Sequence, residues 1–137
     1  MRCVVPFALL GTLATVGCTS STASTAATAP TAVTTETFNG TVNVGGSDFH
    51  TFTSTQSGDV NVTLNAASPP STIFMGVGIG TPSASTCALL SGGTADTQAG
   101  TTSQLSGTLD AGTYCVEVFD VGNETAPVSY TVTVAHP

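Results

Sequence analysis

The sequence predicts an all-β fold, an antiparallel two-sheet β-sandwich of the jelly-roll kind with about eight short strands. From residue 36 onward, apolar side chains alternate with threonine, asparagine or acidic side chains, at the period of two that is typical of a half-buried strand. Clusters of glycine, proline, serine and aspartate separate these runs. No stretch after residue 17 combines the helical period with helix-forming residues.

The first 17 residues indicate export and lipidation. Met1 and Arg2 form a short positive region, and the apolar run from Val4 to Ala14 is shorter than the roughly 20 residues that span a bilayer. The stretch from Thr15 to Cys18 then resembles the bacterial lipoprotein box, in which a small residue precedes a cysteine that receives diacylglycerol. The resemblance implies cleavage before Cys18 and lipidation of its thiol. A conventional signal peptide with a chance cysteine is the alternative.

Residues 18–35 are predicted to form a tether that begins at the lipidated Cys18. After this cysteine the segment consists of threonine, serine, alanine and proline, with Val33 as its one large apolar side chain and no charge. Such a composition buries too little surface to offset the entropy of ordering the chain. We therefore expect a flexible spacer before a folded domain at 36–137. The alternative is an unstructured tail without a spacing role.

The charge balance excludes several classes of partner. The chain has one basic residue, Arg2, against eight acidic ones. Because Arg2 belongs to the predicted signal peptide, the mature chain would contain no Lys or Arg. Nucleic acid is excluded because neutralising phosphates requires these residues. Phosphorylated substrates, acidic lipid head groups and lysine Schiff-base chemistry are excluded for the same reason.

The four cysteines predict one disulfide. Cys3 leaves with the signal peptide and Cys18 carries the lipid, so Cys87 and Cys115 remain in the exported domain. A bridge between them is the only intramolecular pairing left, and a loop of this length is worth about 3–4 kcal/mol. Two free buried thiols are the alternative.

The strands follow in order along residues 36–137. Apolar side chains take alternate positions in the runs 38–44, 60–64, 73–79, 114–118 and 128–134. Turn-forming residues separate them at 45–48, 57–59, 69–70, 110–112 and 122–123. Each strand has one apolar face and one polar face, which predicts antiparallel sheets packed over a single core.

Three stretches of this domain resemble the bacterial pre-peptidase C-terminal domain. They are "FNGTVNVGGSDFHTFTSTQSGDVNVTL", "LSGTLDAGTYCVEVFD" and "PVSYTVTV", and the most specific matches are Leu109, Gly112, Tyr114 and Tyr130. The resemblance implies a non-catalytic β-sandwich of the type appended to secreted peptidases, some relatives of which bind collagen or calcium. Here no peptidase domain precedes the sandwich, and the run 73–79 lacks the aspartates that the family often carries.

The two histidines are weak candidates for chemistry. His50 lies two residues before Phe52 on the same strand face, where we expect it to fill the space of an aromatic ring. His136 is the penultimate residue, and we expect it to fray. A Ser-His-Asp site built on His50, or a zinc site that joins both histidines and an acid, is the functional alternative.

The loop "DVGNET" is a candidate calcium site. Asp120, Asn123 and Glu124 offer closely spaced oxygen ligands beside a glycine. The competing interpretation is a turn in which the Asp and Asn side chains bond their own backbone. We expect no other metal and no cofactor.

Three phenylalanines are candidates for a partner surface. If the alternation holds, Phe49, Phe74 and Phe119 point away from the core and could form an exposed apolar patch. The alternative is that loops or a curled sheet cover them.

Together these features predict a non-enzymatic lipoprotein of the bacterial cell envelope, whose β-sandwich has a binding or structural role. The partner would be an envelope or extracellular protein or polymer. Thr19 after the cysteine is not the aspartate that signals inner-membrane retention, which favours the outer membrane in a Gram-negative cell. A calcium-dependent adhesion module is the first alternative, and a small secreted hydrolase is the second.

Overall fold

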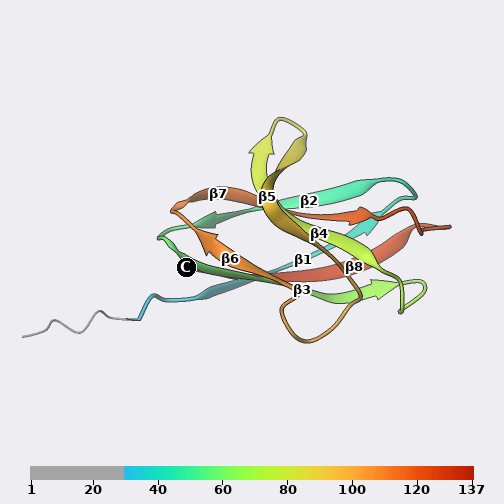
Figure 1. Ribbon diagram of the computed structural model, residues 1–137, viewed down its shortest axis with the longest axis horizontal. Helices are drawn as coiled ribbons and strands as arrows, with labels where there is room; N and C mark the ends of the chain where they lie inside the picture. Colours follow the sequence, from blue (N-terminus) through green and yellow to red (C-terminus); the bar gives the residue numbers. More distant parts are fainter. Residues whose placement is uncertain (1–29) are drawn as a thin grey trace, which may run out of the picture.

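The computed structural model describes residues 30–137, which form eight β-strands and no helix. The strands are β1 (Thr34–Val42), β2 (Ser47–Ser54), β3 (Gly58–Ser68), β4 (Met75–Ser83), β5 (Thr86–Thr97), β6 (Leu105–Leu109), β7 (Gly112–Asp120) and β8 (Val128–His136). They pair antiparallel in two four-stranded sheets that stack as layers (Figure 1). The predicted all-β sandwich is confirmed.

The strand order is that of a jelly roll. The first sheet runs β1-β8-β3-β6 and the second runs β2-β7-β4-β5. Every pair of consecutive strands except β4 and β5 is divided between the two sheets, so the chain crosses the core at almost every turn. Within residues 30–137, no helix is long and apolar enough to cross a membrane.

The core lies between the inner faces of the two sheets, as the alternation predicts. Valines dominate it because β-branched side chains suit a pleated, half-buried surface. The first sheet contributes Val42, Val60, Val62, Leu64, Val128, Val132 and Val134, and the second contributes Phe52, Met75, Val77, Ile79, Val116 and Val118.

Strand β1 begins earlier than the sequence boundary at residue 36. Thr34 already pairs with His136, and Thr35 pairs with Ala135, because β8 extends far enough to offer both residues a partner. The last two residues assigned to the tether therefore belong to the sandwich. Residues 18–29 of the predicted tether, and the signal segment 1–17, lie outside the described residues.

The middle of β4 carries glycine on its outer face. Met75, Val77 and Ile79 point into the core, so the intervening glycines point outward. Each glycine is covered by a side chain from a neighbouring strand, namely Gly76 by Phe119, Gly78 by Leu89 and Gly80 by Cys87. A Cβ at Gly76 would collide with the Phe119 ring. The glycine row is therefore a shallow groove that other strands fill.

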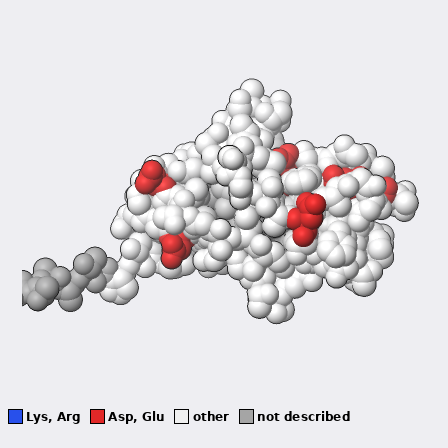
Figure 2. Space-filling view, in the orientation of Figure 1, with Lys and Arg blue, Asp and Glu red and all other residues white. Residues whose placement is uncertain are grey.

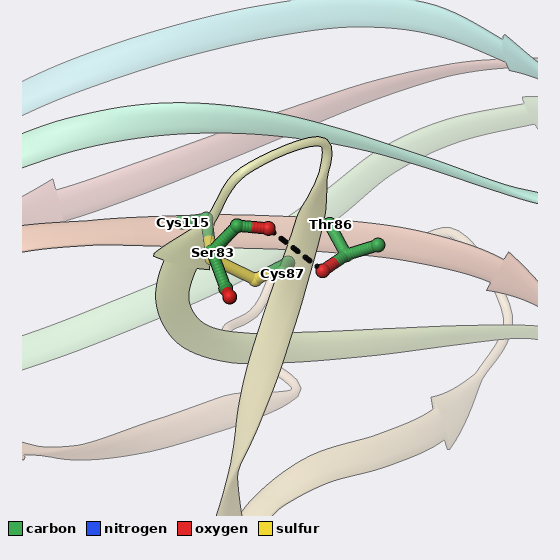
Figure 3. The surroundings of a disulfide bond; sticks show 4 residues. All are labelled: Ser83, Thr86, Cys87 and Cys115. Carbon is green, nitrogen blue, oxygen red and sulfur yellow. Dashed lines mark hydrogen bonds between the residues drawn. A yellow bond between two sulfur atoms is a disulfide. The ribbon is translucent and has the colours of Figure 1, made fainter.

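The disulfide predicted from the cysteine count is present. Cys87 on β5 is bonded to Cys115 on β7, with their Cα atoms 5.9 Å apart (Figure 3). Strand β4 lies between these two strands, and Cys115 is paired directly with Gly80. The bridge thus crosses the outer face of β4 at a glycine. Cys87 is paired with Pro82, next to the Ser83–Thr86 pair that ends the β4–β5 hairpin. The bridge therefore fastens this hairpin to β7 close to its turn, which projects from the body of the sandwich (Figure 1).

Candidate functional site

The outer face of the second sheet brings Phe49 and Phe119 close together. Phe49 on β2 pairs with Glu117 on β7, and Ser47 pairs with Phe119. The two phenylalanines are therefore diagonal cross-strand neighbours on one face, a separation that aromatic side chains can bridge. Both rings are half-buried.

Phe74 joins them from the start of β4. It precedes the buried Met75, which places it on the outer face, and its side chain is 49% exposed. Gly76, two residues further on, is paired with Phe119. All three rings thus lie on the same face and at the same end of the sheet, where β2 and β4 begin and β7 ends. The sequence prediction that they point away from the core holds.

Two carboxylates share this face with the rings. Glu117 lies directly across from Phe49. Gly76 on β4 is paired with Asp96 of β5 on one side and with Phe119 of β7 on the other. Asp96 is exposed and Glu117 half-buried. We call these five residues, Phe49, Phe74, Asp96, Glu117 and Phe119, the aromatic face.

The aromatic face and the beginning of β1 lie at opposite ends of the sandwich. Strand β1 starts at Thr34 and runs nine residues, about 30 Å, before the loop that leads into β2. In Figure 1 this loop and the β7–β8 loop lie at the end far from the entering chain. The rings are therefore about the length of a strand away from Thr34.

Within residues 30–137, no Lys or Arg faces the carboxylates. Residues 30–137 contain no Lys or Arg, and Figure 2 shows acidic patches without a basic one on the visible surface. Both ion pairs in this part of the chain are made by histidines, His50 with Asp48 and His136 with Glu36. Glu117 and Asp96 take part in neither.

Asp120, the first calcium candidate, organises its own loop. One carboxylate oxygen, Oδ1, accepts hydrogen bonds from the backbone N–H groups of Gly122, Asn123 and Glu124, at 2.7, 3.0 and 3.2 Å. The other, Oδ2, accepts one from the N–H of Gly45 at 2.8 Å. These bonds, first the one from Gly45, lower the pKa of Asp120. Asp120 thus follows the turn interpretation, and both of its carboxylate oxygens have backbone partners, whereas the exposed Asn123 contributes only its backbone N–H.

Glu124 is the unexpected member of that loop. It is the one buried residue between Val121 and Pro127, only 6% exposed, and neither carboxylate oxygen has a hydrogen-bond partner. Loss of solvation raises its pKa, and the negative charge of Asp120 raises it further. Residues 30–137 hold no group of three His, Cys, Asp or Glu side chains that could bind a metal. The turn chemistry of the sequence gives no signal that this side chain points inward.

His50 occupies the space of an aromatic ring, as the sequence predicts. It stacks on Phe38 with the ring centroids 4.9 Å apart. Its Nε2 lies 3.0 Å from the Tyr130 hydroxyl, which donates a hydrogen bond to Asp48 at 2.9 Å. Burial, and then Asp48, raise the pKa of Tyr130 far above its usual range. Gly40 leaves room for this cluster, since a Cβ there would collide with the Asp48 carboxylate.

The expectation that His136 frays is wrong. Its side chain is 2% exposed, and its Nε2 lies 3.0 Å from a Glu36 carboxylate oxygen. The ring also lies 5.1 Å from that of Phe52. The terminus is held because the Pro137 carbonyl accepts hydrogen bonds from the Thr55 N–H and the Ser54 hydroxyl. His50 and His136 thus have separate acidic partners, Asp48 and Glu36, rather than forming one site.

A small apolar hollow opens at the opposite edge of the sandwich. It has a volume of about 150 Å³ and lies where residues 90–93 loop out of the β4–β5 pairing, beside β6. Its lining includes Val60, Ile79, Leu90, Leu105 and Leu109. The Gly92-Gly93 pair marks the irregularity in the sequence, but alternation alone does not predict the hollow.

Comparison with models of known protein families, and with curated proteins, finds no match to this chain. The resemblance to the pre-peptidase C-terminal domain therefore remains an expectation from the residues. Because one fold serves many functions, the jelly roll itself does not define an activity.

Proposed function

We propose that this protein is a non-enzymatic lipoprotein of the cell envelope whose β-sandwich binds a partner through the aromatic face. The observation that supports it most is that three phenylalanine rings share one end of an outer sheet face, with Phe74 half exposed to solvent. Aromatic side chains are enriched in the buried centres of protein interfaces.

The position of this face fits an anchored molecule. Cys18, the proposed lipidation site, precedes β1, and the aromatic face lies about a strand length beyond Thr34. Anchoring on that side attaches the domain to the membrane through the end that is opposite the rings, which leaves the aromatic face free for a partner. We place the domain in the periplasm or outside the cell, with the outer membrane favoured in a Gram-negative bacterium because Thr19 follows the cysteine.

The histidines support a non-catalytic role. A general base needs a nucleophile or substrate proton within hydrogen-bond reach. The Nε2 atom of His50 meets the Tyr130 phenol, and that of His136 meets a carboxylate oxygen of Glu36. These contacts stabilise the sandwich where β1, β2 and β8 meet. Turnover of any substrate in a panel of ester, peptide and glycoside substrates would contradict this part of the proposal.

A calcium-dependent adhesion module is a second candidate, favoured by one observation. The buried carboxylate of Glu124 lacks a hydrogen-bond partner, and a cation would satisfy it. Against this, both oxygens of Asp120 already have backbone partners. Calorimetry with calcium separates the two functions. We expect no heat of binding and an unchanged melting temperature, whereas stabilisation by micromolar calcium would favour adhesion.

Affinity capture tests the aromatic face. The detergent-solubilised full chain is immobilised and exposed to envelope extract, beside a Phe74→Ser variant. We expect the variant to lose most of the captured partner at an unchanged melting temperature. Val33→Ser is the matched control, because Val33 is exposed and apolar but lies beside the first sheet. Equal capture by wild type and by both Phe74→Ser and Phe49→Ser variants would contradict the proposal.

A further inference from the structure

Building on the proposed function, we propose that the aromatic face binds a segment of a partner protein that carries Lys or Arg. The starting observation is that carboxylates and rings alternate on this face. Glu117 pairs with Phe49, and Asp96 lies in the same cross-strand row as Phe119, with only Gly76 between them. A cationic side chain laid on a phenylalanine ring would find a carboxylate in the adjacent cross-strand position.

Gly76 makes this arrangement possible. Because Gly76 has no side chain, the Phe119 ring lies across the position that a Cβ of residue 76 would occupy. The ring is thereby turned over β4, toward the strand that carries Asp96. A guanidinium can stack on such a ring and bond a carboxylate beside it at the same time.

Within residues 30–137, these carboxylates have no Lys or Arg partner. The only Lys or Arg of the chain is Arg2, which precedes the proposed mature N-terminus. The ion pairs of residues 30–137 involve Asp48 and Glu36, and neither acid of the aromatic face. The positive charge that complements this face must therefore come from another molecule.

The same charges disfavour other occupants. An uncharged apolar partner would bury Glu117 without a counter-charge, which is costly. A second copy of residues 30–137 would bring the same acids against themselves, and this part of the chain has no Lys or Arg to pair with them. Nucleic acid and acidic proteins are repelled.

Selection from a random peptide library tests the inference. The full chain in detergent micelles is the bait, and enriched peptides are measured by fluorescence anisotropy. We expect Lys or Arg next to apolar residues in the enriched peptides, and weaker binding at higher salt. Glu117→Gln should weaken binding about two- to fivefold, the effect of one exposed cation contact. Phe74→Ser should weaken it too.

Asp59→Asn is the matched control, because Asp59 is an exposed acid on β3 of the other sheet. It removes the same charge and should leave the affinity unchanged. Enrichment of uncharged or acidic peptides, or of none, overturns the inference, as does an equal effect of Glu117→Gln and Asp59→Asn. Dimerisation of the chain that Phe74→Ser abolishes also overturns it.

The inference and the proposed function fail in different ways. If the inference is overturned while Phe74→Ser still abolishes capture of the envelope partner, the aromatic face binds a partner of another chemistry. If both Phe74→Ser and Phe49→Ser leave that capture unchanged, the proposed function itself fails.

Discussion

Two carboxyl groups in one short loop show how strongly the environment decides the role of a residue. Asp120 accepts four backbone hydrogen bonds, and its pKa is lowered. Glu124, four residues later, has no hydrogen-bond partner in its buried position, and its pKa is raised. The charged Asp120 therefore holds the loop together, whereas the charge on Glu124 destabilises the folded domain.

Glu124→Gln should stabilise the domain at neutral pH. The folded pKa of Glu124 exceeds its ordinary value of 4.5, so the charged group opposes folding at high pH, and the penalty disappears below pH 4.5. We expect a gain of about 1 kcal/mol at pH 7, from removing a poorly solvated charge. Thermal unfolding of both proteins at pH 7 and pH 4 measures this, and the two curves should converge at the lower pH. Destabilisation at pH 7 would mean that the carboxylate has a partner, such as a cation.

The phenylalanines of the aromatic face should differ in their contribution to stability. Phe119 covers Gly76 and is half-buried, so Phe119→Ser should cost about 1–2 kcal/mol, roughly half the loss for a fully buried ring. Phe74 is 49% exposed, and Phe74→Ser should stay within about 0.5 kcal/mol. Denaturant unfolding measures both. A large loss for Phe74→Ser would place that ring in the core and remove it from the binding surface.

Some residues could be placed from the sequence and others could not. The outward direction of the rings and the aromatic role of His50 follow from strand alternation, which is a local property. The burial of His136 does not, because it depends on Glu36, 100 positions earlier, and on hydrogen bonds to the last residue. The inward turn of Glu124 also escapes a sequence reading, since its loop has the composition of an ordinary exposed turn.

At the scale of elements, β4 is unusual because its two faces follow different rules. Its inner side chains form the centre of the core, while its outer glycines accept side chains from β5 and β7. The alternation in residues 73–79 predicts the inner face. It gives no reason for three glycines outside, because a glycine in a strand costs stability unless another group fills its place. That reason appears only once β7 and β5 are known to flank β4.

Gly80→Ala should destabilise the domain by about 2–3 kcal/mol. Its Cβ would collide with the Ala88 carbonyl oxygen and lie 2.8 Å from the Cys87 sulfur, and neither a backbone atom nor a disulfide can move aside easily. Gly107→Ala on β6 is the control, because nothing lies within 4 Å of its Cβ position. That variant should change stability by less than about 0.5 kcal/mol. If urea unfolding showed the same loss of stability for both variants, β4 would not require a glycine at position 80.

The Cys87–Cys115 bridge should stabilise the sandwich substantially. It closes a loop between residues 28 positions apart, which corresponds to about 3–4 kcal/mol of lost unfolded-state entropy. A Cys87→Ala, Cys115→Ala variant should therefore melt well below the oxidised protein, and reduction should bring the wild type toward the variant. Quantitative labelling of both thiols in native exported protein would contradict the role of the bridge.

At the scale of the molecule, the jelly roll gives the sandwich two different ends. One end holds the start of β1 and the end of β8, closed by His136 and Glu36. The other holds the loops around Gly45 and Asp120, joined by a hydrogen bond, and the aromatic face beside them. This separation arises from the strand order, which pairs segments far apart in the chain and which local alternation cannot predict. Fold class and the alternating strands at 38–44, 60–64, 73–79, 114–118 and 128–134 were accessible from the sequence, whereas strand β5 and this polarity were not.

The difference between the two ends matters for the proposed function only if the chain is anchored before β1. The Cys18→Ala variant tests this anchor. The thiol of Cys18 is the proposed acceptor of diacylglycerol, and stable anchoring takes two acyl chains or more because a single one binds marginally. We expect the variant to lose the acyl mass and the cleavage before residue 18, so that it remains an uncleaved precursor. Mass spectrometry of the exported protein measures both changes. Cys3→Ala, within the proposed signal peptide, should change neither. A wild-type mature N-terminus within residues 24–27 without an acyl mass would contradict the anchor, and the attachment of the membrane at the end opposite the aromatic face would lose its basis.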